Sequence, residues 1–157
     1  MKQRAQNWFV LMGFILLAEG EGIVGSFFTT PNIPTWYATL TKPPIAPPNW
    51  VFGPVWTTLF LLMGIAAYFV WRTGVRSRSA LQIFGIQLAL NVLWSLIFFG
   101  LQNPGAAFIE IILLWLAIVW TIYAFSRHSK LAAWLLAPYI AWVSFASVLN
   151  YFIWVLN

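Results

Sequence analysis

The chain has 157 residues, of which 62% are hydrophobic, 19% are aromatic and only 7% are charged. Soluble domains carry about a quarter charged residues, so this composition excludes an ordinary water-soluble domain and indicates an integral membrane protein. The net charge of +5 comes from short basic clusters between apolar runs, a pattern typical of membrane topology signals and contacts with anionic lipid headgroups rather than of nucleic-acid binding.

Five apolar segments are long enough to cross the hydrocarbon core as helices, which takes roughly 20 residues each. Runs such as IILLWLAIVW do not alternate, and this excludes the strands of a membrane β-barrel. The sequence therefore predicts an all-α integral membrane bundle of five transmembrane helices in a single domain, residues 1–157. The predicted helices cover residues 8–28, 50–71, 80–99, 105–125 and 131–155.

The first segment follows MKQR and has the small residues Ala18 and Gly20, as a signal-peptide cleavage site would. Glu19 lies between them and apolar sequence continues beyond, so we expect the segment to remain as the first helix. Glu19 shares a helical face with Gly22 and Ser26. We expect this face to point into the bundle, where Glu19 either serves a ligand or ties helices together.

The connector between the first two helices, WYATLTKPPIAPPNWVFGPVW, is aromatic, proline-rich and almost uncharged. Prolines at 43, 44, 47 and 48 fix φ and restrict the residues before them. We predict a semi-rigid segment that forms the lid and one wall of a cavity for a flat apolar ligand, because a rigid lid loses less entropy when a ligand binds.

Three later helices each carry a stripe of rings beside amides, hydroxyls or small residues. Facing one another, these stripes would line an aromatic cavity with a few polar groups; the alternative is that the rings form interfacial belts and ordinary core. The stripes comprise Trp56 and Phe60 in the second helix, Asn91, Trp94, Ser95 and Phe98 in the third, and Tyr139, Trp142, Ala146 and Asn150 in the fifth.

Some intramembrane residues leave alternatives open. Gly85 and Ala89 mark either a seam within the bundle or a dimer face. Glu110 either binds a ligand or proton or ties helices together. Pro54 and Pro138 lie inside predicted helices and tend to bend them, which widens a cavity or only serves packing.

Metal chemistry has little support in the sequence. The chain has no cysteine and a single histidine, His128, beside other basic loop residues. Thiolate sites and sites built from several histidines are excluded. We expect no metal and no required cofactor, and no cluster of nucleophile, base and orienting residue indicates a conventional enzyme.

Basic residues sort to one side of the predicted bundle. Only Lys42 lies on the other side, so the positive-inside rule predicts a cytoplasmic N-terminus and an outward C-terminus. We expect the host membrane to be a prokaryotic cell membrane. The seven residues on the first side are Lys2, Arg4, Arg72, Arg76, Arg78, Arg127 and Lys130.

Three segments together resemble signatures of the translocator-protein family, which includes the bacterial tryptophan-rich sensory proteins and the mitochondrial peripheral-type benzodiazepine receptors. They are WYATLTKPPIAPPNWVFGPVWT, LALNVLWSLIFFGLQNP and APYIAWVSFASVLNYFIW. The resemblance covers essentially the whole chain. It implies a five-helix bundle, usually a homodimer, that binds porphyrins such as protoporphyrin IX and drug-like apolar molecules in a cavity opening toward the first connector.

By resemblance, the ligand-binding positions are Trp36, Tyr37, Trp56, Phe60, Asn91, Trp94, Ser95, Glu110, Ile111, Trp142 and Ala146. We expect a porphyrin between Trp56 and Trp142, with polar contacts from Asn91, Ser95 and Tyr37. Light- and oxygen-dependent porphyrin degradation, which some bacterial members are reported to perform, would use Trp56 and Trp142 as redox participants. A structural scaffold is the remaining alternative. Tyr151 lacks the following basic residue of the sterol pattern, so cholesterol is not an expected ligand.

Overall fold

A computed structural model describes residues 2–157, with side chains from Asn7 onward, so the side chains of Lys2 and Arg4 lie outside the described part. Across residues 2–157 the chain is helical and has no strand. Five of its helices are long and apolar enough to cross a membrane, and each predicted range lies inside one of them. The predicted all-α membrane bundle is confirmed. The spans are Asn7–Asn32, Asn49–Trp71, Val75–Gly100, Pro104–Ser126 and Lys130–Leu156.

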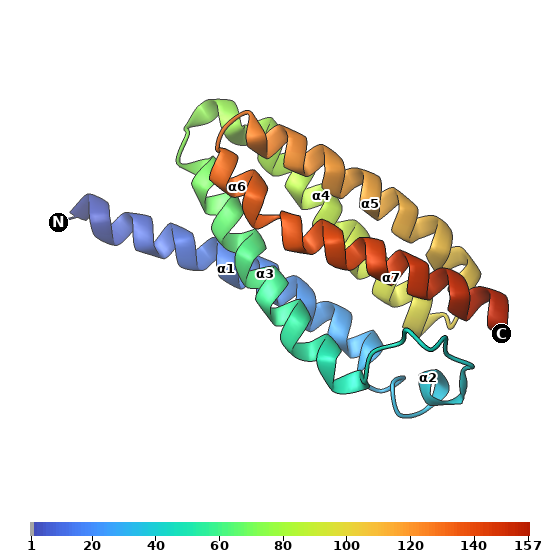
Figure 1. Cartoon of the computed structure of the whole chain (residues 1–157). Coiled ribbons are helices and arrows are strands. Elements are labelled where there is room, and N and C mark those ends of the chain that lie inside the picture. The colour runs from blue at the N-terminus through green and yellow to red at the C-terminus, as the bar shows by residue number, and fades with distance from the viewer. Residues whose placement is uncertain (1) are drawn as a thin grey trace.

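The spans form a closed ring, and α3 and α4 also contact each other directly. Helix α1 packs against α3 and α4, α4 packs against α5, α5 packs against α6 and α7, and α6 returns to α3. Figure 1 shows α2 at the same end of the bundle as the C-terminus, whereas the N-terminal half of α1 projects away from the other helices. The elements are α1 (Lys2–Thr29), α2 (Trp36–Thr39), η1 (Asn49–Val51), α3 (Phe52–Trp71), η2 (Val75–Ser77), α4 (Arg78–Ser95), the π-helical η3 (Leu96–Gly100), α5 (Pro104–Ser126), α6 (Lys130–Leu135) and α7 (Ala137–Leu156).

Prolines have different effects in the second and fifth spans. Pro138 has no N–H to continue the hydrogen bonding of the preceding turn, and the fifth span is divided at Leu136 into α6 and α7. Pro54 lies in the first turn of α3, where its N–H would have had no helical partner. The bend expected at Pro54 is therefore not found. Pro54 lies at the start of the helix, and α3 continues unbroken from Phe52 to Trp71.

Small residues bring α1 close to α3. A Cβ added at Gly64 would lie 2.7 Å from the Cα atom of Ile15, and one at Gly22 would overlap the Phe60 ring. By contrast, no atom lies within 4 Å of a Cβ built at Gly85. Gly85 and its neighbour in the stripe, Ala89, are exposed, so among residues 7–157 they form no seam, and a dimer face there stays a prediction.

Hydrogen bonds hold the first connector to two other parts of the chain, the C-terminal residue and the loop after η3. The backbone N–H of Thr41 donates to Oδ1 of Asn157 at 2.9 Å, and Nδ2 of Asn157 donates to the Thr41 carbonyl at 3.1 Å. A second contact joins Nε2 of Gln102, after η3, to Oδ1 of Asn32 at 3.1 Å. The connector is thus held in place by polar contacts as well as by its prolines.

Candidate functional site

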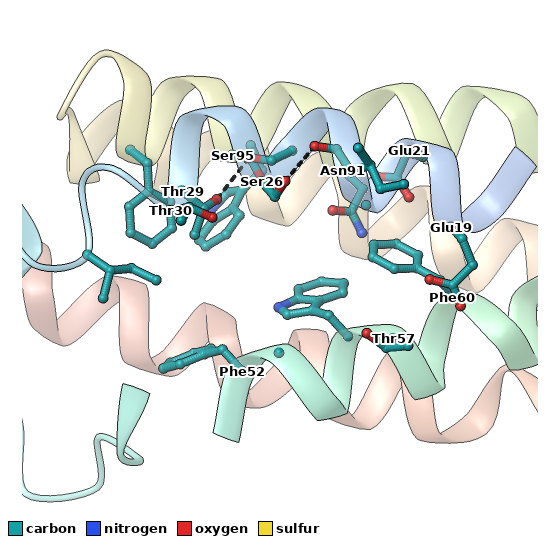
Figure 2. A pocket seen from close by; sticks show the side chains of 18 of the residues that line it. Glu19, Glu21, Ser26, Thr29, Thr30, Phe52, Thr57, Phe60, Asn91 and Ser95 are labelled. Atoms are coloured by element: carbon teal, nitrogen blue, oxygen red, sulfur yellow. Dashed lines mark hydrogen bonds between the residues drawn. The ribbon is translucent and has the colours of Figure 1, made fainter. Parts of the chain in front are cut away.

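A cavity of about 500 Å³ lies between α1, the start of α3 and the end of α4. Figure 2 shows residues from these elements around it, with Phe60 and Thr57 of α3 facing Glu21 of α1 and Asn91 of α4 across the open space. Pockets for drug-sized ligands generally occupy roughly 300–1,000 Å³. The volume is therefore suited to a drug-sized ligand.

Aromatic rings form the α3 wall of the cavity. Trp56 stacks on Phe60, with ring centroids 5.4 Å apart and planes inclined by 25°. Trp56 and Phe60 are four residues apart and lie on one face of α3, and the missing side chain of Gly22 leaves room for the Phe60 ring. Trp94 of α4 also lines the cavity. Such a surface favours a flat apolar molecule, which stacks and buries a large area.

The α4 wall is held by a buried hydrogen-bond chain that begins at Asn91. Nδ2 of Asn91 donates to the Tyr139 hydroxyl at 2.9 Å, and that hydroxyl donates to Oε1 of Gln87 at 2.8 Å. Nε1 of Trp94 likewise donates to Oδ1 of Asn150 at 3.0 Å. These bonds tie α4 to α7, so the amide and indole on the cavity wall are fixed in orientation before any ligand arrives.

The α1 wall carries both acidic side chains of the cavity and several of its hydroxyl groups. Ser26 and Thr29 donate to carbonyls of their own helix at 2.7 and 3.0 Å. Glu19 and Glu21 also line the cavity, and Oε2 of Glu21 is buried without a hydrogen-bond partner. A buried acceptor without a partner is costly in a protein interior. That oxygen is not accessible from the cavity, so the groups of this wall that a ligand could meet are the other carboxyl and hydroxyl oxygens.

The structure brings five of the eleven sequence-predicted residues to this cavity. All five come from the stripes on the second and third predicted helices, and they surround one space together with the α1 wall. They are Trp56, Phe60, Asn91, Trp94 and Ser95.

Trp142 lies outside this cavity. It lines a separate space of about 700 Å³ between α3 and α7, beside Pro54 and Pro138. Its ring meets Phe52 edge to face at a centroid distance of 6.0 Å, and its Nε1 is buried without a partner. The ring that Trp56 meets from α7 is Tyr139, at 6.3 Å. The structure thus does not place Trp56 and Trp142 in one cavity.

The two connector residues pack against η3 instead of facing the cavity. Trp36 lies 5.5 Å from Phe98 and Tyr37 lies 5.8 Å from Phe99, measured between ring centroids. Tyr37 is 3% exposed, and burial raises the pKa of its hydroxyl. From the connector region, Ile33 and residues 49–50 line the cavity instead.

The last three predicted residues belong to the packed interior. Ile111 is 2% exposed in the main core, and Ala146 packs against that core. Glu110 is also buried, and neither of its carboxyl oxygens has a hydrogen-bond partner. None of the three lines the cavity.

Glu21 is a cavity residue that the sequence interpretation left unassigned. The signal that could have found it is a stripe of small and polar residues in α1, in which Glu21 precedes Gly25 and Thr29 at intervals of four. A second row, containing Gly22 and Ser26, runs beside it. In an apolar helix such a double row indicates the face turned toward protein or a cavity.

The chain is similar over nearly its whole length to proteins of one family. Residues 14–155 match the TspO/MBR family. The tryptophan-rich protein TspO of Archaeoglobus fulgidus is 47% identical over 96% of this chain and 99% of its own length. The human translocator protein is 42% identical over 96% and 91%, and the tryptophan-rich sensory protein of Cereibacter sphaeroides is 32% identical over 92% and 89%. With these matches spread across all five membrane-spanning helices, the chain belongs to the TspO/MBR family.

Proposed function

We propose that this membrane protein is a receptor, sensor or carrier for a flat apolar ligand of the protoporphyrin IX type. The observation that carries the proposal is the cavity of about 500 Å³ in which Trp56 and Phe60 stack opposite polar groups of α1 and α4. Relatives named translocator protein and tryptophan-rich sensory protein favour transport or sensing as the purpose of binding.

In the proposed complex, the tetrapyrrole plane lies against the Trp56–Phe60 stack. Aromatic faces attract such a ligand through offset stacking and the large area that it buries. Asn91 and Ser95 of α4 contact its polar edge. Because Asn91 is already oriented by its bond to Tyr139, little side-chain entropy is lost when the ligand arrives.

A dark titration with protoporphyrin IX, read by quenching of tryptophan fluorescence, tests the proposal. We compare Trp56→Leu, which removes a cavity ring, with Trp142→Leu, which removes a ring of the neighbouring space. Losing one stacked ring should weaken binding by roughly tenfold, whereas Trp142→Leu should stay within about twofold. Equal loss in both variants would move the ligand toward Trp142, and unsaturable quenching in the wild type would favour a structural scaffold.

Light- and oxygen-dependent degradation is a second candidate function, favoured by the indole of Trp56 on the cavity wall. In this reaction the excited porphyrin would take one electron from the stacked Trp56 indole and pass it to dioxygen, and the indole radical would regain an electron from the porphyrin. The resulting superoxide and porphyrin radical would combine, so that the tetrapyrrole gains both oxygen atoms of dioxygen. We expect a new tetrapyrrole product only under light and oxygen, and slower bleaching in Trp56→Phe. Intact ligand recovered after illumination would leave binding alone. Unchanged bleaching in both Trp56→Phe and Trp142→Phe would exclude tryptophan participation.

We also propose that the N-terminus faces the cytoplasm and that α2 and the C-terminus face outward, following the basic residues. The chain contains no cysteine, so single cysteines introduced at Thr41 and Val75 can be labelled cleanly. An impermeant thiol reagent added to intact cells should label position 41 and spare position 75. The reverse pattern would invert the orientation.

A further inference from the structure

A third cavity, of about 500 Å³ and lined in part by charged residues, lies at the end of the bundle away from α2. It is formed where α3 ends, where η2 leads into α4, and where α1 passes nearby. It belongs to neither the ligand cavity nor the Trp142 space, because it shares no lining residue with them. The residues that matter to its chemistry are Asn7, Trp71, Arg72, Val75, Arg78 and Leu81.

Two arginines of this cavity have no acidic neighbour. The chain has three acidic residues, at positions 19, 21 and 110, and none of them lines the space. Arg72 is positioned by its guanidinium lying 5.7 Å from the centre of the Tyr68 ring, and Tyr68 in turn stacks on Trp71 at 6.2 Å. Arg72 and Arg78 thus present unneutralised guanidinium groups, which suit the geometry of a phosphate.

The backbone adds positive potential at the same place. Gly74 has φ +92°, which favours glycine, and the chain then turns into η2 and α4. The N-terminal end of an 18-residue helix carries partial positive charge and favours anions. The Ser77 hydroxyl donates to the Gly74 carbonyl at 2.7 Å and does not cap α4, so no side-chain oxygen of Ser77 occupies this end of the helix.

Apolar side chains border the cationic part. Val75 is 74% exposed and Trp71 is 37% exposed, and Leu81 lines the cavity one turn into α4. Trp71 and Val75 are end residues of two membrane spans, and span ends are where lipid headgroups and acyl chains are expected to meet. A free phosphate would use only the arginines, whereas a phospholipid would also cover the apolar border.

We propose that this cavity is a binding site for an anionic phospholipid. The lipid phosphate lies between Arg72 and Arg78 near the start of α4, and the adjoining acyl chain packs along Trp71 and Leu81. The basic residues at this end then do more than set topology, because two of them hold one lipid molecule at the junction of α3 and α4.

Native mass spectrometry of the full chain in detergent tests the site, with phosphatidylglycerol and phosphatidylcholine as probes. We expect one phosphatidylglycerol to be retained preferentially over phosphatidylcholine. Each of Arg72→Gln and Arg78→Gln removes a charge-assisted contact and should weaken retention by about tenfold. The matched control is Arg76→Gln, which removes the same charge from the same turn at a residue that does not line the cavity; it should change retention by less than about twofold.

Two further measurements separate a built site from general attraction. The double variant Arg72→Lys with Arg78→Lys keeps the charge and should retain more lipid than either Gln variant, and thermal unfolding without lipid shows whether each variant is folded. Retention that falls equally in Arg76→Gln, or that does not distinguish the two lipids, would overturn the proposal. Displacement of phosphatidylglycerol by millimolar inorganic phosphate would show a phosphate site without a lipid role, and would overturn it as well.

Discussion

The two sides of the bundle are built differently. In the span that contains α1, only 11% of the most apolar window is buried inside the protein. In the spans that contain α4 and α5, the buried share of that window is 39%. The α1 side holds the cavity with its two carboxyl groups, and the opposite side holds the Tyr139 hydrogen-bond chain within a packed core. A space for a ligand thus lies where the bundle is least tightly packed, beside an α4 wall whose Asn91 and Trp94 side chains are held by hydrogen bonds to α7.

Removing the centre of the packed side should have the largest effect. Tyr139 is 1% exposed and links Asn91 to Gln87. Tyr139→Ala leaves a cavity and two broken hydrogen bonds, so we expect a loss of about 3–5 kcal/mol in the free energy of unfolding. Tyr139→Phe keeps the ring and should lose only about 1 kcal/mol, as is usual for a hydrogen bond within a membrane protein. Unfolding in mixed micelles measures both, and equal losses would contradict this division between packing and hydrogen bonding.

The crossing of α1 and α3 offers a test of how firmly α1 is held. At Gly64 an added Cβ would meet the backbone of Ile15 at 2.7 Å, and backbone cannot move aside as a side chain can. We expect Gly64→Ala to destabilise the bundle by about 1–3 kcal/mol. Gly13→Ala in α1 adds the same methyl group where nothing lies within 4 Å, and should be neutral or slightly stabilising. If both variants have wild-type stability, α1 is free to shift along α3.

Filling the cavity should reduce binding and leave stability unchanged. Ser26 lines the cavity and bonds only its own helix. Ser26→Leu places a larger side chain in the space that the ligand would occupy. If the resulting overpacking costs the complex roughly 1.4 kcal/mol, protoporphyrin IX binding becomes about tenfold weaker. Ser126→Leu makes the same change at an exposed serine that also bonds only its own helix and lies outside the cavity, and it serves as the control. Undiminished binding by Ser26→Leu would place the ligand outside this cavity.

Replacing a glutamate by methionine in the packed core and at the cavity compares a closed site with an open one. Glu110 is buried with both carboxyl oxygens unpartnered, whereas Glu19 lines the cavity. Replacing the buried carboxyl by a side chain of similar shape removes an unsatisfied polar group, so Glu110→Met should stabilise the protein by on the order of 1 kcal/mol. Glu19→Met should change the unfolding free energy little. A loss of stability in Glu110→Met would show that Glu110 has a bound partner, such as internal water.

The sequence predicted the helices well because lipid imposes a minimum length and strong hydropathy on each span. It also predicted the cavity residues of α3 and α4, since helical spacing places Trp56 with Phe60 and Asn91 with Ser95. It could not place Trp142, because periodicity gives the face of a helix but not its rotation relative to a neighbour, and the break before α7 resets that rotation. The fit of Tyr37 against η3 likewise depends on a π-helical turn, which no simple period encodes.

The smallest expected loss of stability concerns the connector between α1 and α3, which is hydrogen-bonded to the C-terminal end of α7. Asn157 makes two hydrogen bonds to the backbone of Thr41, and both are exposed, so Asn157→Ala should cost only about 0.5–1 kcal/mol. Its main consequence is local: the Thr41 amide should exchange hydrogen faster, and the ligand should dissociate faster if the connector gates the cavity. Thr41→Ala is the matched control, because only the backbone of Thr41 takes part and that variant keeps both bonds. Faster exchange with unchanged ligand dissociation would mean that the connector is fastened for stability alone, and that ligands enter elsewhere, past the loosely packed α1.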